Sequence, residues 1–377
     1  MLVVVDCVMA DIQKVSSRAD LKRFIEYPYQ LYKNHPTWVP QLLLQEWDDL
    51  DQSRKKNPFF EHAVADYFLA LEGSRIVGRI AAIHDKSYNE FHNEAVVLFA
   101  CFEAESAAVS KMLLETVEQW GKSKNLSLVK GPSKVSQNDM MGVLIENFDD
   151  PPVVMMVYNP PTYAGFIEGA GYTKSEDTLA WRMTVEGGLP DRVARIAERV
   201  KRNLKVNIRK VGLSSKKALA AELPILRDIY NAAWDKNWGF VPWTEHEIQH
   251  LAEQLGQVAD KDLCLIAEVD GKPAAFSITL PDINEAMKGT GGRLWGLAKL
   301  LLTKPKRMRL VAMGILPEFQ GRGLDALIYA ETFWRGRSKY NAGEFGWTLE
   351  SNDAINNGMK ALGATQYKRY RIFQKRI

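Results

Sequence analysis

The feature that most constrains this chain is an internal duplication, in which two stretches run through one order of predicted elements. Each stretch alternates strand, helix, strand, helix and strand. The first stretch has them at residues 95–103, 106–124, 126–139, a later helix and 169–183; the second has them at 309–315, 325–340, 344–353, a helix ending at 362 and 363–375. A supersecondary unit that occurs twice predicts two modules of one fold.

A hairpin pattern precedes each stretch, at residues 67–83 and again at 264–280, where two alternating apolar runs are joined by a glycine turn. Helical segments come before the hairpins, at residues 20–33, 218–234 and 245–255. This order of strands and helices predicts an α/β fold with a mixed sheet flanked by helices in each half.

The chain has 377 residues, which is too long for one ordinary core and suits two domains. Gly187, Gly188 and Pro190 interrupt the periodic pattern between the two copies. We therefore predict two modules, at residues 1–187 and 188–377.

The two copies differ at the turn between the first strand and the helix. In the second copy this turn lies in GILPEFQGRGLDALIY, residues 314–329, whereas the first copy has FEAESAAVSK, which contains no glycine. Backbone N–H groups converge on an anion at a strand–loop–helix junction of this kind. Gly321 and Gly323 allow a ligand to approach the backbone and allow a positive φ. The sequence predicts an anion-binding loop in the second module and a supporting role for the first.

The second half resembles the GNAT superfamily, the GCN5-related N-acetyltransferases, whose signature R/Q-x-x-G-x-G/A lies between the fourth strand and the third helix. The signature falls on Gln320, Gly321, Arg322, Gly323, Leu324 and Asp325. From about Asp11 onward the whole chain looks like a tandem GNAT protein, with a mixed, mostly antiparallel sheet in each module. The resemblance implies that this loop, with Ile315, Leu316 and Asn352, binds acetyl-CoA or a longer acyl-CoA as the donor for acyl transfer to an amine.

Two positions depart from the family pattern. The last signature position, usually glycine or alanine, is Asp325, and its carboxylate competes with a pyrophosphate unless it points away and Arg322 offsets its charge. Many GNAT enzymes have a tyrosine general acid four residues before the glycine that ends the last helix, and here that position is Met359. Tyr367 and Tyr370 either replace that acid or pack on the terminal strand, and Tyr367 is our candidate.

Acyl transfer to an amine needs a base that takes the proton of the nitrogen. In the strand 343–351, alternation places Thr348 and Glu350 on one face and Trp347 on the other. Glu350 lies at the carboxyl end of this strand, where open α/β sheets collect ligands. Apolar neighbours are expected to raise its pKa toward neutrality, so Glu350 is the candidate base, with a solvated or ion-paired glutamate as the alternative.

The repeat allows a comparison of these positions. Glu350 aligns with Ser136, so the candidate base is missing from the copy that also lacks the loop. Asn352 aligns with Asn138, and this match also predicts that Asn352 caps a helix or a turn.

One segment, RLWGLAKLLLTKPKRMR at residues 293–309, combines apolar and basic residues and contains no acidic residue. It is typical of a helix on an anionic membrane surface or over a lipophilic substrate, and equally of an ordinary helix that covers the sheet with solvated basic ends. A second basic stretch, at 192–210, predicts the solvated face of a linker helix. The long connection in the first copy, which contains YNPPTY at 158–163, is expected near the acceptor site.

Composition narrows the class of protein. Hydrophobic residues make up 46% and charged residues 25%, as in soluble globular proteins, and a net charge of +3 requires no nucleic-acid partner. Cys101 and Cys264 lie in apolar strand-like runs, as expected of core thiols, and cysteines without metal-ligand spacing fit a reducing cytoplasm. His246 and His250 have i, i+4 spacing but no third ligand, so no metal site is predicted.

The N-terminal sequence MLVVVDCVMADIQKV has no basic region before its apolar run, and Asp6 interrupts that run. It therefore predicts a first strand and not a signal peptide. The apolar stretch 294–302 is far shorter than the ~20 residues that a membrane-spanning helix needs. We expect a cytoplasmic protein, with peripheral membrane contact if the segment 293–309 lies on a bilayer.

These observations favour an acyl-CoA-dependent N-acyltransferase with catalysis in the second module and a small-molecule or lipid-like amine as acceptor, without a metal and without a specific nucleic acid. One alternative is a Fem-like aminoacyl transferase, which also has tandem GNAT-like modules and uses charged tRNA; the glycine signature argues against it, and the basic stretches argue for it. The other alternative is a non-catalytic, degenerate GNAT pair that binds a ligand, which Asp325 and Met359 favour.

Overall fold

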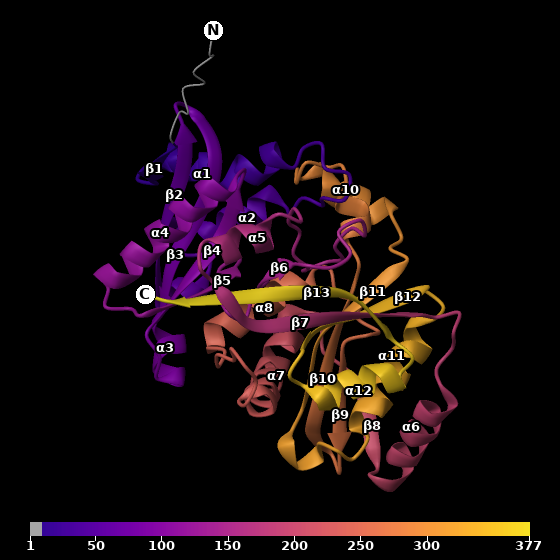
Figure 1. Ribbon diagram of the computed structural model, residues 1–377. Helices are drawn as coiled ribbons and strands as arrows, with labels where there is room; N and C mark the ends of the chain where they lie inside the picture. The colour runs from indigo at the N-terminus through magenta and orange to yellow at the C-terminus, as the bar shows by residue number, and fades with distance from the viewer. Residues whose placement is uncertain (1–9) are drawn as a thin grey trace.

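The computed structural model describes residues 10–377. In the first half, five helices flank the strands of the sheet (Figure 1). The helices are α1 (Arg18–Leu31), α2 (Leu43–Leu50), α3 (Lys86–His92), α4 (Ala107–Ser123) and α5 (Tyr163–Gly169). The strands are β1 (Asp11–Lys14), β2 (Ala63–Glu72), β3 (Arg75–Asp85), β4 (Val96–Ala104), β5 (Leu128–Ser133), β6 (Val143–Leu144) and β7 (Thr173–Thr184).

The second half repeats this arrangement. Its helices are α6 (Asp191–Asn203), α7 (Lys216–Trp234), α8 (Glu245–Gly256), α9 (Asn284–Met287), α10 (Trp295–Leu302), α11 (Leu324–Gly336) and α12 (Asp353–Ala361). Its strands are β8 (Val206–Lys210), β9 (Leu265–Val269), β10 (Lys272–Pro281), β11 (Arg307–Ile315), β12 (Ala342–Leu349) and β13 (Thr365–Arg376).

The strands of both halves form one sheet, in the order β1-β2-β3-β4-β5-β13-β7-β12-β11-β10-β9-β8, with β6 beside β13. Within the described residues, β4 with β5 and β11 with β12 are the parallel pairs, and the other neighbouring strands are antiparallel. The fold is therefore the predicted α/β arrangement of two similar units, each with a mixed, mostly antiparallel sheet.

The last strand of each half pairs across the middle of the molecule. The C-terminal strand β13 lies between β5 and β7, with Phe373 opposite Gly131 in β5. Strand β7 in turn pairs with β12, where Trp181 lies opposite Phe345. Figure 1 shows β13 as the long yellow strand that runs from the second half into the first. The two halves are joined through their central strands as well as through the linker.

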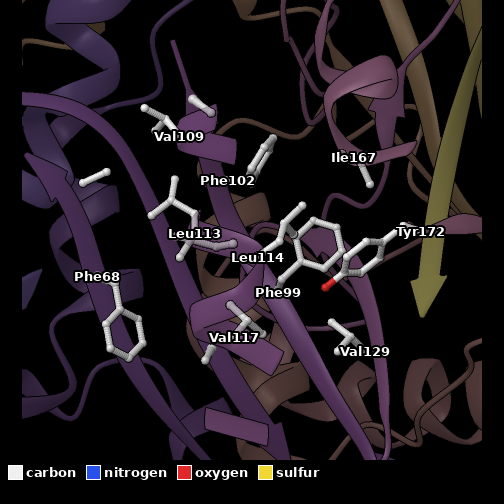
Figure 2. Packing of buried hydrophobic residues seen from close by; sticks show 14 of the residues in the cluster. Phe68, Phe99, Phe102, Val109, Leu113, Leu114, Val117, Val129, Ile167 and Tyr172 are labelled. Atoms are coloured by element: carbon white, nitrogen blue, oxygen red, sulfur yellow. The ribbon is translucent and has the colours of Figure 1, made fainter. Parts of the chain in front are cut away.

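The core of the first half forms where α4 packs on the sheet. Ser106 caps this helix by accepting a hydrogen bond from the Val109 N–H at 3.3 Å. Leu113 and Leu114 on its inner face are fully buried, and Figure 2 shows them beside Phe99 of β4. This packing fixes β4, which lies next to the long connection between β5 and β7.

The structure confirms most of the predicted elements. Both hairpins are present, and Gly73 and Gly271 have the positive φ angles that tight turns need, 61° and 76°. Helices α1, α4, α7 and α8 fall within two residues of the predicted bounds, whereas α11 ends at Gly336 and not at Tyr340. Cys101 and Cys264 are buried and unpaired, as expected of core thiols.

Two predictions need correction or qualification. The basic stretch 192–210 is not all linker helix, because residues 206–210 form the edge strand β8, which pairs with β9. Edge strands tolerate the alternating basic residues found there. The predicted first strand is present as β1 from Asp11, while residues 1–9, including Cys7, lie outside the described residues.

Candidate active site

The predicted anion loop lies at the C-terminal end of β11. A single 3-10 turn, Pro317–Phe319, follows the strand, and α11 begins at Leu324. Gly321 and Gly323 have φ angles of 69° and 81°, which confirms that these glycines supply a left-handed backbone. The loop therefore turns back on itself immediately before the helix.

The loop presents unused N–H groups. Among the described residues, the N–H groups of Gly321, Arg322 and Gly323 have no hydrogen-bond acceptor, and the first-turn N–H groups of a helix also lack intrahelical partners. The side-chain amide of Gln320 donates to the Ile315 carbonyl at 3.0 Å and so braces the loop against the strand end. A Cβ atom added at Gly321 would meet no heavy atom within 4 Å, so the space over this backbone is open. This arrangement fits a phosphate group.

The two charged residues of the loop do not neutralise each other. Arg322 lies with its guanidinium 5.7 Å from the centroid of the Phe319 ring. Within the described part of the chain, Asp325 forms no hydrogen bond or ion pair, and the N-terminus of α11 has no side-chain cap. Burial, with a contribution from the Asp325 charge, raises the pKa of Tyr329 one turn further along the helix. The Asp325 carboxylate is therefore an uncompensated negative charge beside the loop.

Strands β11 and β12 separate before they reach the loop. Their parallel pairing runs from Arg307 opposite Ala342 to Leu310 opposite Phe345. Val311 then forms a bulge against β10, because Ile278 pairs with Ala312 and Thr279 with Leu310. Beyond this point β11 follows β10 and β12 follows β7. The two strands therefore diverge on the way to the loop, and we call the region between them the wedge.

A buried ion pair lies at the base of this wedge. Arg309 and Glu344 occupy opposite positions on β11 and β12, and they are 3% and 2% exposed. Arg309 Nε lies 3.3 Å from Glu344 Oε2, but no hydrogen bond forms between them. The other guanidinium nitrogens donate to the carbonyls of Val154, at 2.6 Å, and Gly346, at 2.8 Å. The arginine is fixed, whereas the carboxylate has unused acceptor capacity.

Further unpaired polar atoms surround this pair. Neither oxygen of Glu344 has a hydrogen-bond partner, and the same is true of Trp347 Nε1 and the hydroxyl groups of Tyr367 and Tyr370. An unsatisfied buried polar group costs about 1–3 kcal/mol, so a cluster of them indicates a place that water or a ligand completes. Burial raises the pKa of Glu344 to about 7, although the charge of Arg309 acts in the opposite direction. Glu344 can therefore exchange a proton near neutral pH.

The long connection of the first half covers this cluster. Val154 donates its N–H to Asp282 Oδ1 at 2.9 Å, and the Asn284 side chain donates to the Pro152 carbonyl at 2.9 Å. Val153 and Met156 pack in one apolar cluster with Trp347. This connection, which we call the strap (residues 146–161), therefore ties the first half to the base of the wedge. The predicted YNPPTY segment begins at the end of the strap, and its residues Tyr158 and Tyr163 line a cavity in the first half.

The sequence-predicted candidate base, Glu350, lies in a different setting. Its carboxylate forms ion pairs with Lys174 and Arg369, and its side chain is 37% exposed. Hydrogen bonds from Lys174 and Arg369 lower the pKa of Glu350, so the expectation of a raised pKa is wrong. The two cations lower the pKa of Glu350 more than burial beside apolar neighbours raises it. A catalytic role for Glu350 stays a prediction.

The structure brings Tyr367 close to Glu344 and keeps Asn352 apart. The Tyr367 hydroxyl is buried without a partner, and burial, together with the charge of Glu344, raises its pKa, so that the phenol holds its proton.

Asn352 caps α12 by accepting a hydrogen bond from the Ile355 N–H at 3.2 Å, which confirms its capping role. The Leu316 N–H is occupied by the Ala274 carbonyl at 2.9 Å, so this donor does not face a ligand. Coenzyme A contacts of Ile315, Leu316 and Asn352 stay predictions.

Sequence reasoning missed Glu344, although a signal was present. A glutamate within the apolar strand AGEFGWTL is unusual, because glutamate is almost never fully buried unless it is paired. Arg309 in RMRLVAMGI gives the same signal on the neighbouring strand. A parallel pairing of these strands would have placed the two residues opposite each other. Among the described residues, no group of His, Cys, Asp and Glu is arranged to hold a metal ion.

Two curated proteins are similar to this chain over almost its whole length, whereas no family model matches it. Protein YghO of Escherichia coli (strain K12) is 36% identical over 374 residues, which cover 96% of this chain and 94% of that protein. A bacterial ceramide synthase of Caulobacter vibrioides (strain NA1000 / CB15N) is 35% identical over 382 residues, which cover 96% of each.

Solved structures show the same architecture at low sequence identity. A tandem GNAT protein from the clavulanic acid biosynthesis pathway superimposes with a TM-score of 0.60 at 11% identity and covers 97% of this chain and 98% of that one. A GCN5-related N-acetyltransferase from Sphaerobacter thermophilus gives a TM-score of 0.54 at 12% identity, with 97% and 95% covered. These matches establish the tandem GNAT fold.

Proposed function

This chain belongs to the tandem GNAT family that includes protein YghO and the bacterial ceramide synthase, and we propose that it transfers an acyl group from acyl-coenzyme A to the nitrogen of a lipophilic amine. The observation that carries the proposal is the loop at Gly321–Gly323, where two positive φ angles and unused N–H groups form a phosphate cradle at a helix N-terminus.

The loop would hold the pyrophosphate of the donor, and the wedge between β11 and β12 would take its extended pantetheine arm. From Leu310 to Ile315 the strand rises roughly 16 Å at about 3.3 Å per residue. Strand β11 thus connects the phosphate cradle with the buried cluster around Glu344. The thioester carbonyl would lie toward this cluster, because the phosphates are fixed at the other end of the strand.

Glu344 and Tyr367 are suited to the two proton transfers of the reaction. The amine nitrogen attacks the thioester carbon, the carbon–sulfur bond breaks, and the thiolate leaves with the electron pair. Glu344, with its pKa at about 7, would accept the proton that the nitrogen loses. The Tyr367 hydroxyl has no acceptor in the structure and would donate its proton to the thiolate. We place Glu344 ahead of Glu350 as the base because the ion pairs of Glu350 weaken its basicity.

The expectation of a lipophilic acceptor has two supports. The relative named bacterial ceramide synthase makes, by its name, ceramide, which is the amide of a long-chain amino alcohol. In this chain, α10 does not cover the sheet but packs mainly on α9 at the periphery, as Figure 1 shows. This placement supports a lipid-facing or substrate-facing role for α10 over that of an ordinary sheet-covering helix.

An exposed apolar surface accompanies α10. Trp295 is 51% exposed and Leu302 is 87% exposed. The Leu43 N–H donates to the Gly292 carbonyl at 2.9 Å and brings α2 beside the start of this helix. We call the result the apolar surface, and it consists of Leu44, Leu294, Trp295 and Leu302.

Charge complementarity indicates what covers the apolar surface. The exposed side chains of Arg293, Lys304 and Lys306 flank it, and residues 293–309 include no Asp or Glu. Apolar residues bordered by cations fit an anionic bilayer surface, and each basic residue near such a surface contributes about 1 kcal/mol. No helix in residues 10–377 is long and apolar enough to cross a bilayer. We propose that the apolar surface rests on anionic lipid, from which the acceptor is drawn.

Isothermal titration with palmitoyl-CoA tests the donor site. Gly321 and Gly188 form a matched pair, because both have φ +69° and a Cβ at either would meet nothing within 4 Å. We expect Gly321→Val to weaken binding at least about tenfold by covering the N–H groups, and Gly188→Val to leave it unchanged. Wild-type protein that binds no acyl-CoA, or equal effects of the two substitutions, would contradict the donor site.

A further inference from the structure

A second polar site lies in the first half, at the position that corresponds to the wedge in the second. Strands β4 and β5 pair in parallel from Val96 opposite Leu128 to Ala100 opposite Ser133, and a cavity of about 150 Å³ lies where they diverge. Its walls come from α1 and the loop after it, from the end of β4, and from the strap. The lining side chains used below are Tyr29, Tyr32, Trp38, Arg79, Glu103 and Tyr158.

A buried carboxylate forms one wall of the cavity. Glu103 is 9% exposed, and its Oε2 accepts hydrogen bonds from the hydroxyl groups of Tyr32 and Tyr163, the latter at 2.7 Å. Its Oε1 accepts no hydrogen bond among the described residues, and Arg79 Nη2, at 3.9 Å, is too far away to donate one. Arg79 Nε is also buried without a partner. The Oε1 atom of this carboxylate is therefore free to accept a hydrogen bond from a molecule in the cavity.

The second half lacks this feature at the matching register. In the first half, β3 begins at Arg75 after the hairpin turn. The residue four positions later, Arg79, lies opposite Glu103 on the neighbouring strand β4. In the second half, the equivalent strand β10 begins at Lys272, and the residue four positions later is Phe276, which lies opposite Gly314 of β11. A Cβ added at Gly314 would lie 2.7 Å from the Phe276 ring, so the ring packs directly on this glycine. An aromatic ring fills the space that is a cavity in the first half. The cavity is therefore specific to the half that has no phosphate loop.

The chemistry of the cavity selects a cation with hydrogen-bond donors. A carboxylate oxygen that accepts no hydrogen bond can accept a charge-assisted one from an ammonium group, although the Arg79 guanidinium already lies 3.9 Å away, and the aromatic residues Tyr29, Trp38 and Tyr158 line the same cavity. A volume of about 150 Å³ is comparable to a cavity that holds benzene, so it admits a head group but not a whole lipid.

The cavity wall continues toward the apolar surface. The Tyr29 hydroxyl donates to the Gln41 carbonyl at 2.8 Å, and both residues line the cavity. Gly292 packs against the outside of this wall, because a Cβ added there would lie 2.4 Å from the Tyr29 ring and from the Gln41 oxygen. Leu294 and Trp295 follow Gly292 in the chain. The apolar surface therefore begins directly behind this wall of the cavity.

We infer that this cavity binds the ammonium head group of a lipid-like primary amine, with Glu103 Oε1 accepting its hydrogen bonds and Trp38 facing the cation. The identification of this amine with the acceptor rests on the proposed function, whereas the binding site itself does not. The strap separates the cavity from the Glu344 cluster, and Met156 contacts both. The cavity would therefore capture the amine before the reaction, and the nitrogen would have to leave Glu103 to reach the thioester in the second half.

The test is titration of wild-type protein with 2-amino-1-octanol in the absence of acyl-CoA, with 1-octanol as the neutral control. We expect the amine to bind more tightly than the alcohol and Glu103→Gln to weaken amine binding roughly ten- to hundredfold, as for a lost hydrogen bond to a charged group. Trp38 is only partly buried, so Trp38→Leu provides a second variant, which should weaken the amine more than the alcohol.

Palmitoyl-CoA affinity, measured on the same samples, separates this site from the donor site. We expect Glu103→Gln and Trp38→Leu to retain wild-type donor affinity, which also shows that both variants are folded. Equal binding of amine and alcohol by the wild-type protein, or unchanged amine binding in both variants, would overturn the inference. Loss of donor binding at the loop with amine binding intact would contradict the proposed function and leave this site standing.

Discussion

Arg309 and Glu344 lie opposite each other on β11 and β12, one residue before the two parallel strands part, and their nearest side-chain atoms are 3.3 Å apart without a hydrogen bond. Both residues are almost fully buried. Removing one partner of a buried ion pair usually costs 3–5 kcal/mol, yet here only the arginine has its other donors used by backbone carbonyls. The glutamate is held in place with its oxygens available for a proton.

Glu344→Gln should lower the turnover number by about 10²–10⁴-fold, because general base catalysis contributes on that scale. Palmitoyl-CoA affinity should stay within about twofold, since Glu344 does not touch the loop. Glu350→Gln is the matched control, and we expect a smaller loss from it. A fully active Glu344→Gln enzyme together with an inactive Glu350→Gln enzyme would show that Glu350, and not Glu344, is the general base.

The pH profile tests the same assignment independently of the size of the rate loss. Because the base must be deprotonated and the pKa of Glu344 is about 7, kcat/KM should rise with pH and level off above neutrality. The inflection near 7 should be absent from the residual activity of Glu344→Gln. A profile that is flat from acid to neutral pH would indicate a base with a lowered pKa, as in Glu350.

Asp325→Asn should tighten acyl-CoA binding by roughly 1 kcal/mol, or about fivefold, because it removes a negative charge from the N-terminus of the helix that receives the pyrophosphate. Asparagine has the same shape, and Asp325 has no partner among the described residues that the change would disturb. Titration calorimetry at low ionic strength measures the difference. Weaker binding in the variant would show that the Asp325 carboxylate favours acyl-CoA binding and does not oppose it.

His62 joins the two halves and should make stability depend on pH. Its ring bonds to Asp85 of the first half at 2.9 Å and to Glu247 of the second at 3.2 Å. Burial alone would lower the pKa of His62, but these two carboxylates raise it to about 10. The stabilisation is therefore complete below the ordinary value of 6.5 and is lost as the pH rises through about 10.

Denaturant unfolding of His62→Gln measures this contribution. The variant should be less stable than wild type by more than about 1 kcal/mol at neutral pH, and the difference should shrink on the alkaline side. His246→Gln, which removes an exposed histidine paired with Glu61, is the control and should show little change. A difference between His62→Gln and wild type that is independent of pH would contradict a charged His62.

Replacing Trp295 and Leu302 together by serine should weaken binding to anionic phospholipid vesicles at least about tenfold, since burial of each large apolar side chain contributes about 1.5–3 kcal/mol. Ile355→Ser, at an exposed apolar position on α12, is the matched control. Vesicle co-sedimentation gives the bound fraction. Equal binding of the two variants, or binding that does not respond to vesicle charge, would contradict the membrane-facing assignment.

The sequence predicted the parts of the structure that depend on local pattern. The hairpins, the long helices and the two glycines of the loop were all predictable, because turn chemistry and periodicity act within a few residues. The pairing of β7 with β12 and of β13 with β5 was not, because it joins strands of different halves that are far apart in sequence. The pairing of Arg309 with Glu344 was missed because it depends on the register of two strands that are far apart in sequence. The raised pKa expected of Glu350 was wrong for a similar reason, because its partners Lys174 and Arg369 come from β7 and β13.

The most direct test of the account is to incubate the wild-type protein with palmitoyl-CoA and a long-chain amino alcohol in anionic vesicles, and to follow the amide by mass spectrometry and the free thiol of coenzyme A in the same sample. We predict that amide and thiol appear in equal amounts, that Gly321→Val and Glu344→Gln each abolish most of both, and that Gly188→Val leaves both unchanged. Thiol release without amide, or no product from a protein that binds both ligands, would contradict acyl transfer to a lipophilic amine.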